Sequence, residues 1–398
     1  MKRSIIDMAN LMHSADPDAR FAFELWDGEI IVHGNQPVVS LRFRSKEGAK
    51  KVLCNGFLGF GEAYMADDLD VEGDLQELLR LGIRLRYDRQ NLSLWQKIRF
   101  LTHSLATRNT LDRAPQNIEH HYDIGDEFYQ LFLDRTLTYS CGYFTCESDS
   151  LEQAQLNKYE HICRKLKLQP GENLLDIGCG WGGMLIYAAQ NYDVKGLGVT
   201  LSPNQYERAK RKIKELDLHN SIRVALADYR EIEGEFDKFV SIGMFEHVGK
   251  AFIPVFMKEL SRLLKKGGIG LLHTIGKASE SPGDPWILKY IFPGGYIPNL
   301  SEIVREMGLA GFSLLDLENL RFHYAHTLDR WADNYERNLA KVKQMFDESF
   351  SRMWRLFLNA SSVGFKYGNS RLYQILFSNG LNNELPLTRK HLYEDAYH

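Results

Sequence analysis

A glycine-rich turn between a predicted strand and a predicted helix constrains the fold more than any other feature of this sequence. It reads LLDIGCGWGG, from Leu174 to Gly183. Glycines permit a tight turn and let a ligand approach the backbone closely. Apolar runs suited to buried parallel strands follow it, namely KGLGVTLS, IRVALAD, FDKFVSIG and GIGLLHTIG. Helices fit between these runs, so we predict an α/β fold with a Rossmann-like, doubly wound sheet.

Local signals also predict where several elements begin and end. Ser202 and Pro203 are a helix N-cap and first-turn pair. The two glycines after LLKK, at 267 and 268, predict the stop of another helix. Apolar residues of period two predict short strands and turns over residues 21–60, and the spacing of apolar residues in 327–363 predicts helix.

The ligand of the glycine turn is open between two nucleotides. Gly178, Gly180 and Gly183 satisfy the dinucleotide fingerprint, which would make the chain a nicotinamide oxidoreductase. However, the next strand ends in GVTLS and lacks the acid that binds an NAD ribose. Asp176 precedes the first glycine and Asp228 follows the third strand. This pattern favours S-adenosylmethionine, with Asp228 at the adenine amine, over two simple strand-end caps.

The absent ribose acid is also a departure from most methyltransferases. We expect a hydroxyl, a backbone group and an amide to take its place. The three residues that supply them are Thr200, Leu201 and Gln205.

Composition sets outer bounds on function. Lys and Arg number 49 against 52 Asp and Glu, a net charge of −3, which argues against a nucleic-acid partner. Five cysteines without a CxxC pair give neither a disulfide framework nor a zinc cluster, and no metal site is expected. The first residues lack a signal peptide's apolar core, and no apolar run reaches the ~18–20 residues of a membrane span. We therefore expect a cytoplasmic protein, with binding to a membrane surface left open.

Two adjacent stretches carry opposite charge. Residues 62–79 hold seven acidic residues and no basic ones, whereas residues 80–113 hold eight basic residues and two acidic ones among apolar side chains. Two interpretations remain: a solvated basic helix beside an acidic loop, with the two stretches paired to each other, or a surface for anionic lipid headgroups.

Several long motifs in fixed order carry a family resemblance. They are EHHYDIGDEFYQLFLDRTLTYSCGYF (119–144), LLDIGCGWGG (174–183), GVTLSPNQ (198–205), SIGMFEHVG (241–249), LLHTIG (271–276) and YIFPGGYIP (290–298). Together they resemble the cyclopropane-fatty-acyl-phospholipid synthases and mycolic acid cyclopropane synthases. The resemblance implies a class I methyltransferase domain over 114–398. GFLGFGEAYM resembles the N-terminal domain of the bacterial phospholipid enzymes, which implies a smaller α+β domain over 1–113 for membrane docking or dimerisation.

The resemblance also implies a reaction and a catalytic site. A methyl group passes from S-adenosylmethionine to a cis double bond of an unsaturated phospholipid acyl chain, a proton leaves, and a cyclopropane ring closes. A bound bicarbonate is the implied base. Backbone N–H groups of Cys141 and Ile275, the side chains of His273 and Tyr324, and the carboxylate of Glu246 would hold it. We call these five residues the predicted base site.

Further contacts follow from the same resemblance. Tyr139 and Ser140 would touch the cofactor, with Tyr229 beside Asp228. An aromatic stretch would line the acyl channel or form a packed loop; it comprises Trp286, Tyr290, Phe292 and Tyr296. The implied enzyme is a homodimer, peripherally bound to the inner face of the membrane. A lipid C-methyltransferase that leaves a branched chain and a non-catalytic lipid-binding module remain as alternatives.

Overall fold

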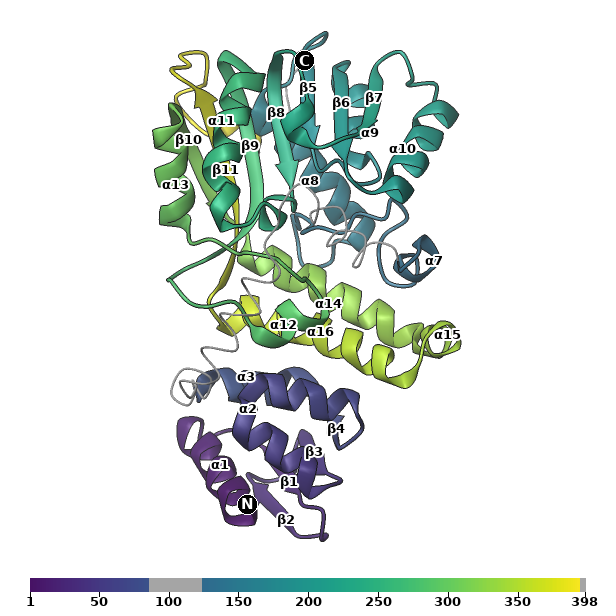
Figure 1. Ribbon diagram of the computed structural model, residues 1–398, viewed down its shortest axis with the longest axis vertical. Helices are drawn as coiled ribbons and strands as arrows, with labels where there is room; N and C mark the ends of the chain where they lie inside the picture. The colour runs from purple at the N-terminus through teal and green to yellow at the C-terminus, as the bar shows by residue number, and fades with distance from the viewer. Residues whose placement is uncertain (86–123, 394–398) are drawn as a thin grey trace. The chain divides into compact units, whose positions relative to one another are not determined.

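The computed structural model describes residues 1–85 and 124–393 of the chain (Figure 1). They fall into two compact units. The first takes in the described part of residues 1–107 with Pro282–Pro293 and Leu328–Asn369, and the second takes in the described part of residues 108–281 with Gly294–Thr327 and residues 370–393. The predicted domain boundary between 113 and 114 lies outside the described residues. The first unit therefore draws on three separate stretches of sequence.

The first unit contains a four-stranded sheet in the order β2-β1-β3-β4. Its alternating burial follows the period-two pattern: Val39, Leu41 and Phe43 of β3 are buried, and the residues between them are not. Helices α1, α2 and α3 contact this sheet. The elements are α1 (Lys2–Ala15), β1 (Phe21–Glu24), β2 (Ile30–His33), β3 (Val39–Phe43), α2 (Lys46–Met65), β4 (Leu69–Gly73), α3 (Leu75–Arg84), α12 (Pro285–Tyr290), the part of α14 (Arg321–Arg337) after Thr327, α15 (Leu339–Met345) and α16 (Glu348–Tyr367).

One prediction for this unit is wrong. Residues 46–60 were expected as strands and turns, but they belong to helix α2, which Ser45 caps by accepting a hydrogen bond from Gly48 N. The helix kinks at Gly56, where φ is 55°. A Cβ at Gly59 would lie 1.9 Å from Lys51 O, so this residue must be glycine for the two halves to approach. Gly56 and Gly59 therefore allow a bend and close packing inside one helix.

The acidic stretch is largely paired within the first unit. Asp70 lies 3.0 Å from a guanidinium nitrogen of Arg352 on α16. At the start of the basic stretch, Arg80 and Arg84 each lie 2.6 Å from the same Asp16 oxygen. The remainder of that stretch, from residue 86 to 113, lies outside the described residues. These described charges are therefore paired mainly with residues outside the two stretches, although Arg80 also pairs with Glu77 of the acidic one.

The second unit is built on a seven-stranded sheet in the order β10-β11-β9-β8-β5-β6-β7 (Figure 1). The five predicted strands are present and parallel where they pair. Two further strands, β10 and β11, were not predicted, and β11 runs antiparallel to both neighbours. The elements are α7 (Asp126–Tyr129), α8 (Leu151–Leu166), β5 (Asn173–Ile177), α9 (Gly183–Tyr192), β6 (Lys195–Thr200), α10 (Pro203–Glu215), β7 (Ile222–Leu226), β8 (Phe236–Ile242), α11 (Ile253–Leu263), β9 (Leu264–Lys277), α13 (Leu300–Leu309), β10 (Phe312–Asn319) and β11 (Ser370–Asn379), with short 3-10 turns at Tyr229–Glu231, Phe245–His247, Lys250–Phe252 and Lys390–Leu392.

Apolar side chains cover both faces of this sheet. Leu175 and Phe239 face a cluster that includes Phe256 of α11, and Leu174 and Val240 face a cluster that includes helices α8 and α9. The chain moves outward from β5 in opposite directions, through β6 on one side and β8 on the other. In such sheets the ligand crevice opens at the carboxyl ends of the strands where the order reverses.

Of the two helix ends predicted in this unit, one is confirmed and the other is wrong. The start of α10 is confirmed, because Ser202 caps it by accepting a hydrogen bond from Gln205 N and Pro203 opens it. The predicted glycine stop is wrong, because α11 ends at Leu263 and β9 already begins at Leu264. Leu264 pairs with Phe236 in the sheet, so strand pairing overrides the helical continuation.

The predicted helical tail is confirmed as α14 to α16, with Trp331, Tyr335 and Val342 buried. Among the described residues no helix has the length and apolar character needed to cross a membrane.

Candidate active site

The glycine turn after β5 has the backbone geometry that its sequence predicted. Gly178, Gly180 and Gly182 all have positive φ, at 84°, 54° and 82°. A Cβ at Gly178 would lie 2.5 Å from the Cβ of Met244, so a larger residue would collide there. Helix α9 then begins at Gly183, where a Cβ would lie 2.4 Å from the Tyr159 hydroxyl. The turn thus carries the chain closely past β8 and α8.

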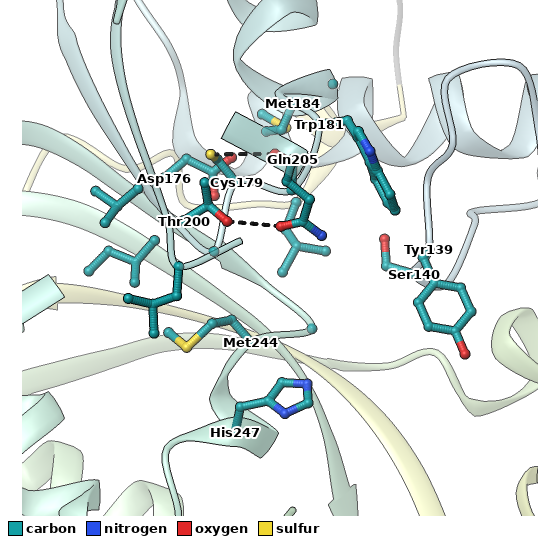
Figure 2. A pocket seen from close by; sticks show the side chains of 18 of the residues that line it. Tyr139, Ser140, Asp176, Cys179, Trp181, Met184, Thr200, Gln205, Met244 and His247 are labelled. Atoms are coloured by element: carbon teal, nitrogen blue, oxygen red, sulfur yellow. Dashed lines mark hydrogen bonds between the residues drawn. The ribbon is translucent and has the colours of Figure 1, made fainter. Parts of the chain in front are cut away.

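A pocket opens at this turn, and all ten residues predicted to contact the cofactor line it. They come from the carboxyl ends of β5 to β7 and from the segment before α8. In Figure 2, Tyr139, Ser140 and Trp181 lie across the pocket from Asp176 and Thr200. The ten are Tyr139, Ser140, Asp176, Gly178, Gly180, Thr200, Leu201, Gln205, Asp228 and Tyr229.

The substitutes for the missing ribose acid form a small polar cluster. The Thr200 hydroxyl donates to Gln205 Oε1 over 2.9 Å (Figure 2). Ser202 N donates back to the Thr200 hydroxyl over 3.2 Å. These bonds fix the Gln205 amide nitrogen as a donor and leave it available to hydroxyl groups of a ligand.

Asp228, which was predicted to lie at the adenine amine, is already paired and also caps the short turn at Tyr229–Glu231. Its two oxygens each accept a hydrogen bond of 2.7 Å from the Arg230 guanidinium. Arg230 N donates to the same carboxylate over 3.0 Å. Asp228 therefore faces the pocket as half of an ion pair, and its role toward an adenine amine stays a prediction.

Asp176 is the buried acid of the pocket, with 2% of its surface exposed. Its Oδ1 has no hydrogen-bond partner among the described residues. Burial raises the pKa of Asp176 to about 7, against the opposing effect of Lys158. A cationic ligand in the pocket would stabilise the ionised form, so this carboxyl suits the sulfonium and ammonium charges of S-adenosylmethionine.

Lys158 is a pocket residue that sequence reasoning missed. It lies on α8, is 1% exposed, and its ammonium donates to the Ser140 hydroxyl over 2.8 Å. Burial lowers the pKa of Lys158 to about 7, although Asp134, Cys141 and Asp176 act in the opposite direction. No helix was predicted over residues 151–166, and the available signal was a lysine on what proves to be the buried face of α8, between Gln155 and Ile162.

The predicted base site is partly assembled by contact between two strand ends. Glu246 follows β8, and its Oε1 accepts a hydrogen bond of 2.5 Å from Ile275 N on β9. Its Oε2 has no hydrogen-bond partner among the described residues. Burial raises the pKa of Glu246 to about 7, while hydrogen bonds from Ile275 and Thr274 act against the shift. The predicted Ile275 donor is therefore directed at Glu246 itself.

His273 lies two residues before Ile275 on the same strand and is 1% exposed. Its Nδ1 lies 3.2 Å from Gln374 Nε2, and its Nε2 has no partner among the described residues. Burial and nearby lysines, including Lys158, hold the pKa of His273 well below its ordinary value. The ring is therefore neutral near pH 7.

Cys141 and Tyr324 belong to segments that touch each other. Gly142 N, next to Cys141, donates to the Thr327 hydroxyl over 2.9 Å, and Thr327 lies one helical turn after Tyr324 on α14. Cys141 is fully buried, and burial raises the pKa of its thiol, so a thiolate nucleophile does not form there. Helix α14 follows Leu320, whose N–H donates to Leu372 O across from Ile275.

The predicted aromatic channel is divided between the two units. Trp286 of α12 is fully buried in the first unit beside Phe57, and Phe292 packs against Phe357. Tyr296 belongs to the second unit, where its N–H donates to Glu246 O over 2.9 Å. The first three aromatics thus form part of a packed cluster within their own unit.

The fold and the pocket together define the class of protein: a class I methyltransferase that uses S-adenosylmethionine. A family model described as mycolic acid cyclopropane synthetase matches residues 109–375, and the chain belongs to this family. A second model, of a domain of unknown function, matches residues 9–90. Class membership removes the nicotinamide oxidoreductase alternative.

Known proteins similar to the chain fall in the same family. The cyclopropane-fatty-acyl-phospholipid synthase of Escherichia coli (strain K12) is 37% identical over 369 residues, covering 90% of this chain and 93% of that protein. A probable fatty acid methyltransferase of Pseudomonas putida is 35% identical, covering 93% and 95%. The crystal structure of mycolic acid cyclopropane synthase CmaA1 complexed with SAH and CTAB matches with a TM-score of 0.63 and 34% identity, over 66% of this chain and 98% of that one.

Proposed function

We propose that this protein converts unsaturated acyl chains of membrane phospholipids into cyclopropane acyl chains with S-adenosylmethionine as methyl donor. The observation that carries the proposal is the similarity to the Escherichia coli synthase, which extends over 90% of the chain and both of its units. The mycolic acid enzymes match a smaller part, 63% of this chain. A phospholipid therefore suits the whole chain better than a mycolic acid does.

The residues of the pocket fit S-adenosylmethionine. Asp176 presents an unpartnered buried oxygen, and the positive φ of Gly178 lets backbone lie where a side chain would collide. Gln205 and Thr200 offer polar groups for ribose hydroxyls. When bound, the sulfonium supplies an electrophilic methyl group, and these residues orient it toward the acyl chain.

The residues of the predicted base site also fit a small oxyanion such as bicarbonate. His273 and Glu246 each have one buried atom without a partner among the described residues, one a donor and the other an acceptor. A bicarbonate held there would supply the base that removes a proton from the added methyl group. Glu246, with its pKa raised to about 7, can accept or share a proton at that point. Cys141 and Tyr324 complete the proposed set.

Methyl transfer to a double bond leaves positive charge on the acyl chain, and the buried residues must keep water from it. Cys141, His273 and Glu246 are each less than 9% exposed. Loss of a proton from the new methyl group then provides the electron pair that closes the ring. A related C-methyltransferase would lose its proton elsewhere and leave a branched or methylene product.

We further propose that the enzyme is a homodimer on the inner face of the cytoplasmic membrane. Residues 1–113 would serve docking or dimerisation, and residues 114–398 would carry catalysis. The sequence of residues 86–113 supports a contact with anionic headgroups, because six basic residues lie among apolar ones there, whereas Arg80 and Arg84 are paired with Asp16.

The test is incubation of the purified protein with S-adenosylmethionine and vesicles of unsaturated phospholipid, followed by mass and NMR analysis of the acyl chains. We expect a mass gain of one CH₂ and cyclopropyl proton signals. A branched methyl or methylene product would replace the proposal with the C-methyltransferase alternative. Unmodified chains from vesicles that still bind the protein would favour the lipid-binding module.

A further inference from the structure

Three polar side chains form a row across the strands β10, β11 and β9. Glu318 pairs with Gln374 in the register of β10 and β11, and Gln374 pairs with His273 in the register of β11 and β9. Directly paired residues in antiparallel strands place their side chains on the same face of a sheet. Gln374 therefore lies between Glu318 and His273, and it is 1% exposed.

Helix α8 supplies the next layer above this row. His161 and Lys165 lie four residues apart and so share one face of the helix. His161 Nε2 lies 2.7 Å from Glu318 Oε2, and Lys165 Nζ lies 2.5 Å from the same oxygen. Lys165 Nζ also donates to Gln374 Oε1 over 2.8 Å. Burial raises the pKa of Glu318, but the donors His161 and Lys165 outweigh burial and lower it to about 2.

The chemistry of these groups leaves one arrangement of protons. A lysine ammonium has donors and no acceptor, so the Gln374 oxygen must face Lys165. The Gln374 amide nitrogen then faces His273 Nδ1, 3.2 Å away, and an amide NH₂ can only donate. Nδ1 must accept, so the single hydrogen of the neutral ring resides on Nε2. That atom is buried and has no partner among the described residues.

We propose that Lys165 and Gln374 are positioning residues which fix His273 as the Nε2–H tautomer, so that it presents a hydrogen-bond donor to the anion in the predicted base site. Neither residue touches the reacting atoms. Lys165 orients the amide, and the amide selects the tautomer. The opposite tautomer would turn a lone pair toward an anion and repel it. The identity of that anion rests on the proposed function, whereas the assignment of the tautomer does not.

The test measures the tautomer directly. The full-length protein is labelled with ¹⁵N-histidine, and ring resonances are recorded by long-range ¹H–¹⁵N correlation, in which protonated and unprotonated ring nitrogens have well separated shifts. A His273→Gln variant identifies the His273 signals. In the wild-type protein we expect a protonated Nε2 and an unprotonated Nδ1.

The informative variant is Gln374→Glu, which keeps size and still accepts from Lys165 but cannot donate. We expect the hydrogen of His273 to move to Nδ1 and cyclopropane formation to fall by up to about 10⁴-fold, the loss seen when a catalytic histidine is held in the wrong tautomer. Lys165→Met should give a mixture of tautomers, and Lys165→Arg should restore the wild-type one because it keeps a donor.

Asn379 offers a matched control on the same strand. It is 1% exposed, its Oδ1 accepts from Lys266 over 3.0 Å, and its amide nitrogen donates to Ser261 O. Asn379→Asp makes the same amide-to-carboxylate change beside a lysine without touching His273. We expect it to lower stability and leave the His273 tautomer unchanged.

An unchanged Nε2–H signal in Gln374→Glu, or a wild-type ring protonated on Nδ1, would overturn the inference. A protein that forms no cyclopropane product would remove the proposed function, while the ¹⁵N signals would still decide the tautomer. Binding of S-adenosylhomocysteine by the variants should match wild type, because neither Lys165 nor Gln374 lines the cofactor pocket.

Discussion

The cofactor pocket and the predicted base site lie in one unit but are built in different ways. The pocket takes its main groups from turns that directly follow β5, β6 and β7, so Asp176, Thr200 and Asp228 each lie at a strand end. The base site takes Glu246 from one strand end and His273 from inside the next strand, and the latter is held by a residue 101 positions away. A pocket of the first kind is encoded locally, whereas the second depends on strand register.

The two regions also differ in the way burial shifts the pKa values of their ionisable groups. In the pocket, Asp176 and Lys158 are both buried, and burial brings the pKa of each to about 7. In the base site, burial raises the pKa of Glu246 and lowers that of His273, so burial favours the uncharged form of both side chains. The pocket is thus suited to a cation and the base site to the exchange of a proton.

The largest expected effect separates catalysis from cofactor binding. Glu246→Gln keeps the oxygen that Ile275 N contacts but removes the carboxylate that would accept the proton of the bound base, so turnover should fall about 10²- to 10⁴-fold, the range for loss of a positioned proton-transfer group. Calorimetry should show S-adenosylhomocysteine binding within about twofold of wild type. Glu306→Gln is a matched control, since Glu306 is also 8% exposed but pairs with Arg305. Unchanged turnover in Glu246→Gln would remove Glu246 from the mechanism.

A smaller effect concerns the pocket alone. As pH rises from 6 to 8, Asp176 loses a proton and becomes anionic, and Lys158 loses a proton and becomes neutral. Both changes favour a cation, so the affinity for S-adenosylmethionine should rise across this range. Asp176→Asn should weaken binding about 10- to 100-fold at pH 8 and flatten the pH dependence.

Titration calorimetry at several pH values checks this expectation, with Asp237→Asn as control. Asp237 is a carboxylate at the opposite end of β8 from Glu246 and lies outside the pocket lining. A pH dependence that survives in Asp176→Asn would assign it to Lys158 or to another group.

The smallest expected effect is on stability. Glu246 has an ordinary pKa of 4.5 when exposed and about 7 when folded, so the folded protein holds a proton that the unfolded chain releases. Its stability contribution is greatest below pH 4.5 and is lost as pH rises through 7. Glu246→Gln should exceed wild type by less than about 1 kcal/mol near pH 5 and by up to about 3 kcal/mol above pH 7. Urea unfolding at pH 5 and pH 8 measures the difference; equal stability at both values would contradict the raised pKa.

Local patterns were sufficient for the elements whose residues interact with near neighbours. The glycine turn, the five parallel strands and the Ser202 cap depend on backbone geometry within a few residues, and all are confirmed. The prediction is wrong for helix α2 and for the end of α11. Helix α2 bends at Gly56, and Gly59 lets its two halves approach within the helix itself. At the end of α11, Leu264 pairs with Phe236, and this strand pairing outweighs the local helix-stop signal.

The sequence alone determined the class of sheet, the family and ten of the residues that line the cofactor pocket, because each of these is carried by contiguous motifs. Only the tertiary structure brought helices α14 to α16 into the same unit as residues 1–85 and aligned Glu318, Gln374 and His273 in one row. A lysine on α8 and a glutamine on β11 carry no motif of their own. The roles proposed for them depend on strand register and on the pairing of hydrogen-bond donors with acceptors. Strand register is defined only once the sheet has formed.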